Sequence, residues 1–303
     1  MHLHASTLRR LTGIAVLAAA AIGAQAAAAS QLIDRNTSQP KLEVNAQGEA
    51  MITYTAGGKL KHVLAWGAVN AIPPAPGKTQ VAFKLDYSGG YGKYHKSNYW
   101  STGSWSCLPY DGTPLAWGVA ACKAPDGSYW ALQAWQRALP DWGVAPSTAQ
   151  SAFELHLSHW TGAIPVLAVT TDWSYHRFDH LFGTFTFQGV PEYGFKSTGA
   201  GVPEDTFGRN IYVDTFDSAY GTGWKRENSF LTHGPKGSFC YGFYPHGGHP
   251  VGKGSKYRAT VIGPGVAPDA MWEGNAPGPY NASADAEANT AQAALGDPKC
   301  NQK

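Results

Sequence analysis

Two segments with alternating side chains hold the residues most able to do chemistry. The first, 153–160, reads Phe-Glu-Leu-His-Leu-Ser-His-Trp. Successive side chains of a strand point to opposite faces. We therefore expect one face, directed to the core, to hold Phe153, Leu155 and Leu157, and the other to hold Glu154, His156 and Ser158. A carboxylate beside an imidazole could do general acid–base work or bind a metal. The alternative is the solvent face of an amphipathic strand.

The second segment, 211–216, places a carboxylate between two aromatic rings. One side of this predicted strand holds Ile211, Val213 and Thr215, and the other holds Tyr212, Asp214 and Phe216. On an open sheet face this arrangement suits sugar binding, because rings stack on the C–H faces of sugars and the acid accepts hydrogen bonds from hydroxyls. The predicted substrate-binding residues are Tyr212, Phe216, Trp173 and Trp224. The alternative is an aromatic pair that faces the core beside a satisfied Asp214.

Hydrolysis of a glycan would need a second acid, because glycosidases place a pair of carboxyl groups across the scissile bond. The candidates to partner Asp214 are Glu154, Asp172 and Glu227, and the predicted catalytic set is Asp214, Glu154, His156 and Glu227. Glu227 belongs to the polar run Trp-Lys-Arg-Glu-Asn at 224–228. We expect this run to be a loop that reaches a ligand or partner, or a surface turn with a local ion pair.

Histidines are concentrated in one region of the chain: His156, His159, His176, His180, His233, His246 and His249. Only His176 and His180 are spaced i, i+4, and the glutamate of an H-E-x-x-H motif is missing. A metal-dependent enzyme is therefore the weakest hypothesis, and no metal or other cofactor is predicted. The sequence also lacks a G-x-S-x-G nucleophile elbow and a G-K-[ST] phosphate loop.

Short alternating segments between Gly, Pro, Asn and Asp clusters must position these residues. With 36 Gly and 20 Pro, a helical bundle is disfavoured. Strands are predicted at 49–55, 60–66, 79–87, 129–136, 153–160, 166–173, 181–188, 210–216, 238–244 and 255–262. A hairpin turn is expected at 56–59, and 129–139 could also be a helix. The pattern predicts an all-β, mainly antiparallel fold, either a β-sandwich or a jelly roll.

The composition changes near Gly274. We expect a single β-rich domain over 30–274 and a Pro/Ala-rich tail over 275–303. Within the tail, 283–295 is predicted to form a short helix that Gly296 and Pro298 end.

The first 29 residues resemble a secretory signal peptide. Arg9 and Arg10 precede an apolar run over 11–22, and small residues at 24–26 and 27–29 fit a cleavage site. The apolar run is shorter than the roughly 20 residues of a membrane helix. We therefore predict that 1–29 is removed and that the protein is secreted.

Four cysteines follow this segment: Cys107, Cys122, Cys240 and Cys300. An even number in an exported protein indicates two disulfides. Proximity favours Cys107–Cys122, which leaves Cys240–Cys300 to tie the tail to the domain. A metal site is the alternative, but the chain has no C-x-x-C pair.

The charges limit the partners. Of 23 Lys+Arg and 21 Asp+Glu, residues 1–29 contribute two Arg, so the mature chain has 21 of each sign. Nucleic-acid binding needs a basic excess, and no later apolar stretch is long enough to span a membrane. We therefore expect no nucleic-acid partner and no integral membrane association. The leading hypothesis is a secreted carbohydrate-active protein that binds a glycan or acts as a glycoside hydrolase or polysaccharide lyase. A non-enzymatic extracellular or cell-surface interaction protein is the alternative.

Overall fold

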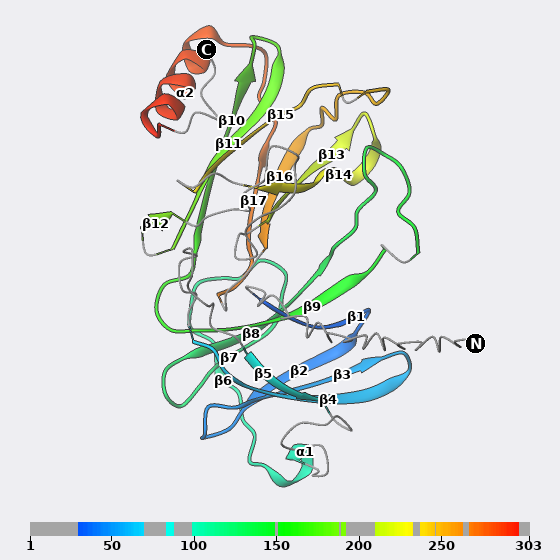
Figure 1. Ribbon diagram of the computed structural model, residues 1–303, viewed down its shortest axis with the longest axis vertical. Helices are drawn as coiled ribbons and strands as arrows, with labels where there is room; N and C mark the ends of the chain where they lie inside the picture. Colours follow the sequence, from blue (N-terminus) through cyan, green and yellow to red (C-terminus); the bar gives the residue numbers. More distant parts are fainter. Residues whose placement is uncertain are drawn as a thin grey trace, which may run out of the picture.

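The computed structural model describes residues 30–69, 83–87, 99–148, 151–187, 189–191, 210–232, 237–245, 247–262 and 267–296. These residues form four sheets in two face-to-face pairs (Figure 1). The predicted signal peptide, Cys300, His233 and His246 lie outside the described residues, as does the tail beyond 296.

The first pair of sheets contains the N-terminal half of the described chain. One sheet has the order β1 (Gln31–Arg35), β9 (Phe153–Trp160), β8 (Tyr129–Gln136), β7 (Gly118–Lys123) and β6 (Leu108–Pro109). The other has the order β2 (Ser38–Val44), β3 (Ala50–Ala56), β4 (Lys59–Gly67) and β5 (Phe83–Tyr87), and the short helix α1 (Tyr99–Thr102) follows. Apolar side chains from both sheets, including Ile52, Leu132 and Leu155, form the core between them.

The second pair follows in the chain. One sheet joins β10 (Val166–Ser174), β11 (Phe178–Phe187), β12 (Val190–Pro191) and β15 (Ser238–Gly242). The other has the order β14 (Gly221–Thr232), β13 (Asn210–Ser218), β16 (Lys256–Ile262) and β17 (Ala270–Asn275). Phe185, Ile211 and Phe239 pack between these two sheets. Helix α2 (Ala282–Ala294) contacts β10.

The predicted fold class is confirmed: the sheets are antiparallel sandwiches and a short helix follows near the C-terminus. Residues 129–136 form a strand and not a helix. The hairpin at 56–59 is present, with Gly57 and Gly58 both at positive φ between the paired Ala56 and Lys59. The single-domain organisation of 30–274 stays a prediction.

The expected loop at 224–228 was wrong, because these residues belong to β14. Lys225 pairs with Thr215 and Arg226 pairs with Asp214 in the ladder with β13. The run is polar because two of its side chains have buried partners: Arg226 binds Asp214, and Glu227 accepts a hydrogen bond from Tyr241. A polar run can therefore be a buried strand when the fold supplies a partner for each charge.

The faces of β9 alternate as predicted, but neither face is open to solvent. Leu155 and Leu157 lie in the core of the first pair, and Glu154, His156 and Ser158 on the other face are buried as well. The solvent-face alternative was therefore wrong. Phe153, expected in the core, is 53% exposed because it lies at the start of the strand.

The second buried face of β8 and β9 meets the other pair of sheets. We call this contact the junction: Gln133, Trp135, Glu154 and His156 on one side, with Tyr212, Arg226 and Asp269 on the other. Across it, the Gln133 amide donates to the backbone oxygen of Asp269 and accepts from its backbone nitrogen, each at 3.0 Å. The rings of Trp135 and Tyr212 lie 6.0 Å apart.

The predicted disulfide between Cys107 and Cys122 is confirmed, and it joins residues 15 positions apart. Cys240 is disulfide-bonded too. Its predicted partner, Cys300, lies outside the described residues.

The double variant Cys107→Ala/Cys122→Ala should lower the free energy of unfolding by about 3 kcal/mol, because the open loop gives the unfolded chain more conformational freedom. Urea denaturation of both proteins without reductant measures the difference. Coincident unfolding curves would contradict a stabilising role for this bond.

Candidate functional site

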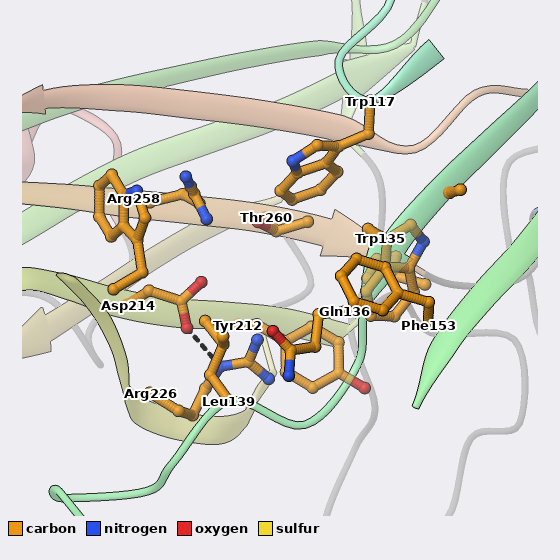
Figure 2. Close-up of a pocket in the computed structure, with 13 residues that line it drawn as sticks. Trp117, Trp135, Gln136, Leu139, Phe153, Tyr212, Asp214, Arg226, Arg258 and Thr260 are labelled. Atoms are coloured by element: carbon orange, nitrogen blue, oxygen red, sulfur yellow. Dashed lines mark hydrogen bonds and ion pairs between the residues drawn. The ribbon is translucent and has the colours of Figure 1, made fainter. Parts of the chain in front are cut away.

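A cavity of about 350 Å³ lies next to the junction, between β8 and the start of β9 on one side and β13, β14 and β16 on the other (Figure 2). This volume is near the lower end of the roughly 300–1,000 Å³ of small-molecule sites. The cavity is lined by aromatic, polar and charged side chains, chiefly Trp117, Trp135, Tyr212, Asp214, Trp224, Arg226, Arg258 and Thr260.

Aromatic rings from separate parts of the chain contribute to the cavity wall. Trp117, just before β7, lies 6.3 Å from Trp135 between ring centroids, with an interplanar angle of 30°. The ring centroids of Trp224 and Phe216 lie 5.1 Å apart. Trp224 lines the cavity, but Phe216 does not. Trp117 has a φ of 50°, a left-handed conformation that costs an L-residue roughly 1–2 kcal/mol. The wall is thus aromatic and partly strained.

The acid on the wall is not free. The carboxylate of Asp214 accepts a hydrogen bond from Arg226 Nε, and both side chains are almost fully buried. Arg226 also lies 4.6 Å from the centroid of the Tyr212 ring and donates to the backbone oxygen of Arg137 at 2.8 Å. Burial raises the pKa of Asp214, and the charge of Arg226 opposes that shift. The expected open sheet face around Asp214 was therefore wrong, because the other pair of sheets covers it.

The second cation on the wall is equally well paired. Arg258 binds Glu273 Oε1 through Nε at 2.8 Å and Nη2 at 2.6 Å. Its guanidinium lies 3.8 Å from the centroid of the Trp224 ring and 5.5 Å from that of Trp117. Each charged side chain on the cavity wall therefore has an oppositely charged partner.

Two polar atoms of residues on the cavity wall lack hydrogen-bond partners in the described part of the chain. Thr260 Oγ1 and Trp135 Nε1 are buried and have no hydrogen-bond partner among the residues that the structure describes. A buried polar group without a partner costs roughly 1–3 kcal/mol. Both residues line the cavity, although neighbouring atoms cover these two polar atoms.

Glu154 and His156 form a network behind Trp135. Glu154 accepts from Arg35 at 2.9 Å and lies 3.2 Å from His156 Nε2. Burial alone would raise the pKa of Glu154, but the bond to His156 and the neighbouring arginine charges outweigh it, so the pKa is lowered.

The other ring nitrogen of His156 reaches a serine. His156 Nδ1 lies 2.8 Å from Ser30 Oγ, which in turn donates to Asp269 at 2.7 Å. These residue types match a catalytic triad. However, Ser30 is buried and its hydroxyl is already bound to a carboxylate, so the group links the two pairs of sheets and does not present a nucleophile.

The remaining predicted site residues lie elsewhere. Glu227 points to the opposite side of β14, where Tyr220 and Tyr241 hydrogen-bond to it and burial raises its pKa to about 7. Asp172 contacts His180 and Gln292 of α2. Trp173 donates to the backbone oxygen of Gly278 at 3.3 Å, and Gly278 precedes the same helix in the chain. The structure therefore brings Tyr212, Asp214 and Trp224 to the cavity, and it does not bring a second acid.

Sequence reasoning missed Trp117, Trp135, Arg258 and Thr260. The alternation of 129–136 could have placed Trp135 beside Glu154, because the two lie opposite each other in the ladder. Trp117 and Thr260 gave no local signal, since only the junction brings them together.

The histidines do not form a metal centre in the described parts of the chain. No group of three or more His, Cys, Asp or Glu there could hold a metal ion. Likewise, no helix within the described ranges is long and apolar enough to cross a membrane.

No protein-family model matches this sequence, and no curated protein and no solved structure matches it either. The chemistry of the site has to be argued from its own residues.

Asp214→Asn should lower the free energy of unfolding by about 3–5 kcal/mol, because it leaves the buried charge of Arg226 without its carboxylate. Adding Arg226→Gln should recover part of this loss, and urea denaturation measures both variants. Asp111→Asn, which breaks the exposed pair with Lys123, is the control and should change little. An Asp214→Asn protein as stable as wild type would contradict the structural role of the pair.

Glu227→Gln should make the protein more stable at pH 8, by up to about 3 kcal/mol, and not at pH 4.5. The folded-state pKa of about 7 lies above the ordinary value of 4.5. The folded protein therefore binds more protons between these values, and the stability of the wild type falls as pH rises from about 4.5 to 7. Urea denaturation across this range tests the difference, and an offset that is the same at every pH would refute it.

Proposed function

We propose that the protein is a secreted glycan-binding protein that holds an uncharged saccharide in the cavity at the junction. The observation that carries the proposal is the composition of the cavity wall: several aromatic rings, two buried polar atoms without partners, and charges that are already paired.

The aromatic rings favour a ligand with apolar faces. Trp117, Trp135 and Tyr212 present ring surface to one small volume, and the C–H faces of a sugar ring can stack on such surfaces. Thr260 Oγ1 and Trp135 Nε1 are covered by neighbouring atoms, and a small side-chain rotation would bring either one to a sugar hydroxyl. A ligand with alternating apolar faces and hydroxyl edges uses both features at once, as a purely hydrophobic ligand would not.

The paired charges favour an uncharged ligand. A carboxylate or phosphate on the ligand would need a cation that is not already paired with an acid of the protein. Arg226 is bound to Asp214, and Arg258 is bound to Glu273. Displacing Asp214 would leave a buried charge unpaired, which is strongly unfavourable, whereas Glu273 is partly exposed and its displacement would cost less. A neutral saccharide requires no such exchange.

Binding is favoured over hydrolysis or lysis. A glycosidase needs two carboxyl groups in one site. Of the four predicted acids, Asp214 is on the wall and bound by Arg226, and Glu154 is bound by Arg35 and His156. Glu227 faces the other side of its strand, and Asp172 contacts His180 and Gln292. None is placed as an available acid and base pair.

Export is part of the proposal. It rests on the sequence of 1–29, which has the composition of a signal peptide. The disulfide between Cys107 and Cys122 supports it, because such bonds persist in oxidising compartments.

Thr260→Val tests the site with little disturbance to the fold. The hydroxyl has no partner in the described structure, so its removal should leave the melting temperature unchanged or raise it. A glycan array should identify a neutral saccharide, and calorimetry should show about three- to tenfold weaker binding by the variant, which matches the loss of one hydrogen bond. Trp224→Ala should weaken binding further.

Thr215→Val is the matched control. Thr215 is also buried without a hydrogen-bond partner in the described structure, but it lies on the opposite face of β13 and does not line the cavity. Its variant should bind like wild type. Equal binding by all three variants, or no neutral saccharide among the array hits, would rule out the proposed site.

A further inference from the structure

The turn between β10 and β11 has an unusual backbone for its residues. Tyr175 and His176 have φ values of 51° and 61°, so both are left-handed, and Arg177 N donates to Ser174 O across the turn at 3.3 Å. Two consecutive central residues with positive φ are typical of a type I′ turn, which prefers Asn-Gly or Gly-Gly. For a bulky residue such as Tyr175 this conformation is a genuine outlier, whereas histidine adopts it more readily.

Another hairpin of the same chain has glycines at the corresponding left-handed positions. In the hairpin of β3 and β4, the two left-handed positions are occupied by Gly57 and Gly58, which have no Cβ and adopt this conformation without strain. The turn at Tyr175 and His176 therefore keeps large rings where glycine would be more stable. Strain of this kind tends to persist where the side chains have a function.

The rings at this turn are exposed and gather with others from distant segments. Tyr175 is 62% exposed and the side chain of His176 is 77% exposed. We call the group the turn platform: Trp173, Tyr175, His176, Phe178, Tyr244 and Tyr280. Ring centroids are 5.9 Å apart for Tyr175 and Tyr244, 4.8 Å for Phe178 and Tyr244, and 5.7 Å for Trp173 and Tyr280.

Helix α2 and its neighbours hold the platform in place. Tyr280 donates to Asp285 at 3.1 Å, and His176 Nδ1 bonds to the Tyr280 hydroxyl. Figure 1 shows the β10–β11 hairpin beside α2, at the end of the molecule opposite the first pair of sheets. The platform is therefore a fixed surface, separate from the cavity.

The chemistry of the platform selects its ligand. Tyr175, Tyr244 and Tyr280 each combine an apolar ring with a hydroxyl, and His176 adds an imidazole. The hydroxyls of Tyr244 and Tyr280 are bonded to Ser174 and Asp285, so the platform offers mainly ring faces to a ligand. The nearest charges are balanced: Asp285 lies 3.6 Å from His176, and Arg177 lies over the Phe178 ring at 4.6 Å. Among the described residues around the platform, no cluster of one sign could attract a nucleic acid or an anionic surface.

We propose that the turn platform is a second glycan-contact surface, which binds the exposed sugar rings of a neutral polysaccharide. The proposal extends the proposed function, because it assigns to the same chain a second contact with the same class of ligand. A polymer long enough to reach both the cavity and the platform is bound with a gain from effective concentration, whereas a short oligosaccharide engages only the cavity.

The variant Tyr175→Gly/His176→Gly replaces the strained pair by the sequence of the β3–β4 turn. Pull-down by cellulose, chitin and starch granules identifies the polymer that the wild type binds. The variant should then bind that polymer at least about tenfold more weakly, as expected for the loss of aromatic anchors. Its affinity for the matching short oligosaccharide should not change, and its melting temperature should be equal or higher. If the double variant is less stable than the wild type, Tyr175→Asn replaces it in the test. This variant keeps His176 and its contact with Tyr280, and it should also bind the polymer more weakly.

The outcomes separate the two sites. Loss of polymer binding with intact oligosaccharide binding supports the platform, and the same loss in a protein that binds no oligosaccharide supports the platform while refuting the cavity. The proposal is overturned if both platform variants bind the polymer as the wild type does. It is overturned as well if the only binding that the variants lose is binding to lipid vesicles. Tyr87→Asn, which alters a partly exposed tyrosine of β5 that donates to the backbone oxygen of Ile33, is the control and should bind the polymer as the wild type does.

Discussion

The structure depends on satisfying polar groups that are buried between two sandwiches. The outward face of β8 and β9 is not apolar, yet it is covered, so its donors and acceptors need partners within the protein. Gln133 meets the backbone of Asp269, Ser30 beside β1 contacts His156 and donates to Asp269, and Arg226 reaches across to the backbone oxygen of Arg137. These directional bonds fix how the two pairs face each other more narrowly than apolar contact would.

The properties of the cavity follow from this constraint. Because the junction has to be neutral overall, the arginines on the wall are held by Asp214 and Glu273. Aromatic rings line the cavity beside those pairs, and the Arg258 guanidinium lies over the Trp224 ring. The result is a small site with fixed walls, little net charge and few free polar atoms, which suits recognition of an uncharged polar ligand and offers no pair of available acids for catalysis.

Backbone strain occurs at both proposed contact surfaces, and also at Trp142, which lies on neither. Trp117 on the cavity wall, and Tyr175 and His176 on the turn platform, are all left-handed residues with large side chains. Core packing does not account for the platform rings, since Tyr175 and His176 are mostly exposed. Residues in such conformations cost stability and persist where the surrounding structure holds them. Their positions are consistent with selection for the surface that they present.

The sequence by itself determined the local features. The period-2 alternation of 153–160 and 211–216 was sufficient to assign side chains to faces, Gly57-Gly58 to predict a hairpin, and the Ala-rich segment near 283–295 to predict a helix. The proximity of Cys107 and Cys122 was sufficient to predict their disulfide. All of these depend on residues close together in the chain, where backbone geometry alone fixes what lies next to what.

Only the tertiary structure decided which faces are covered. The sequence of a strand with one polar face predicts that this face is exposed. No residue within 153–160 indicates that a second sandwich packs on it. The pairing of Asp214 with Arg226, the separation of Glu227 and Trp173 from the cavity, and the meeting of Trp117 with Thr260 all result from contacts between distant segments. The physical reason is that burial and charge pairing belong to the whole fold, whereas periodicity belongs to the single strand.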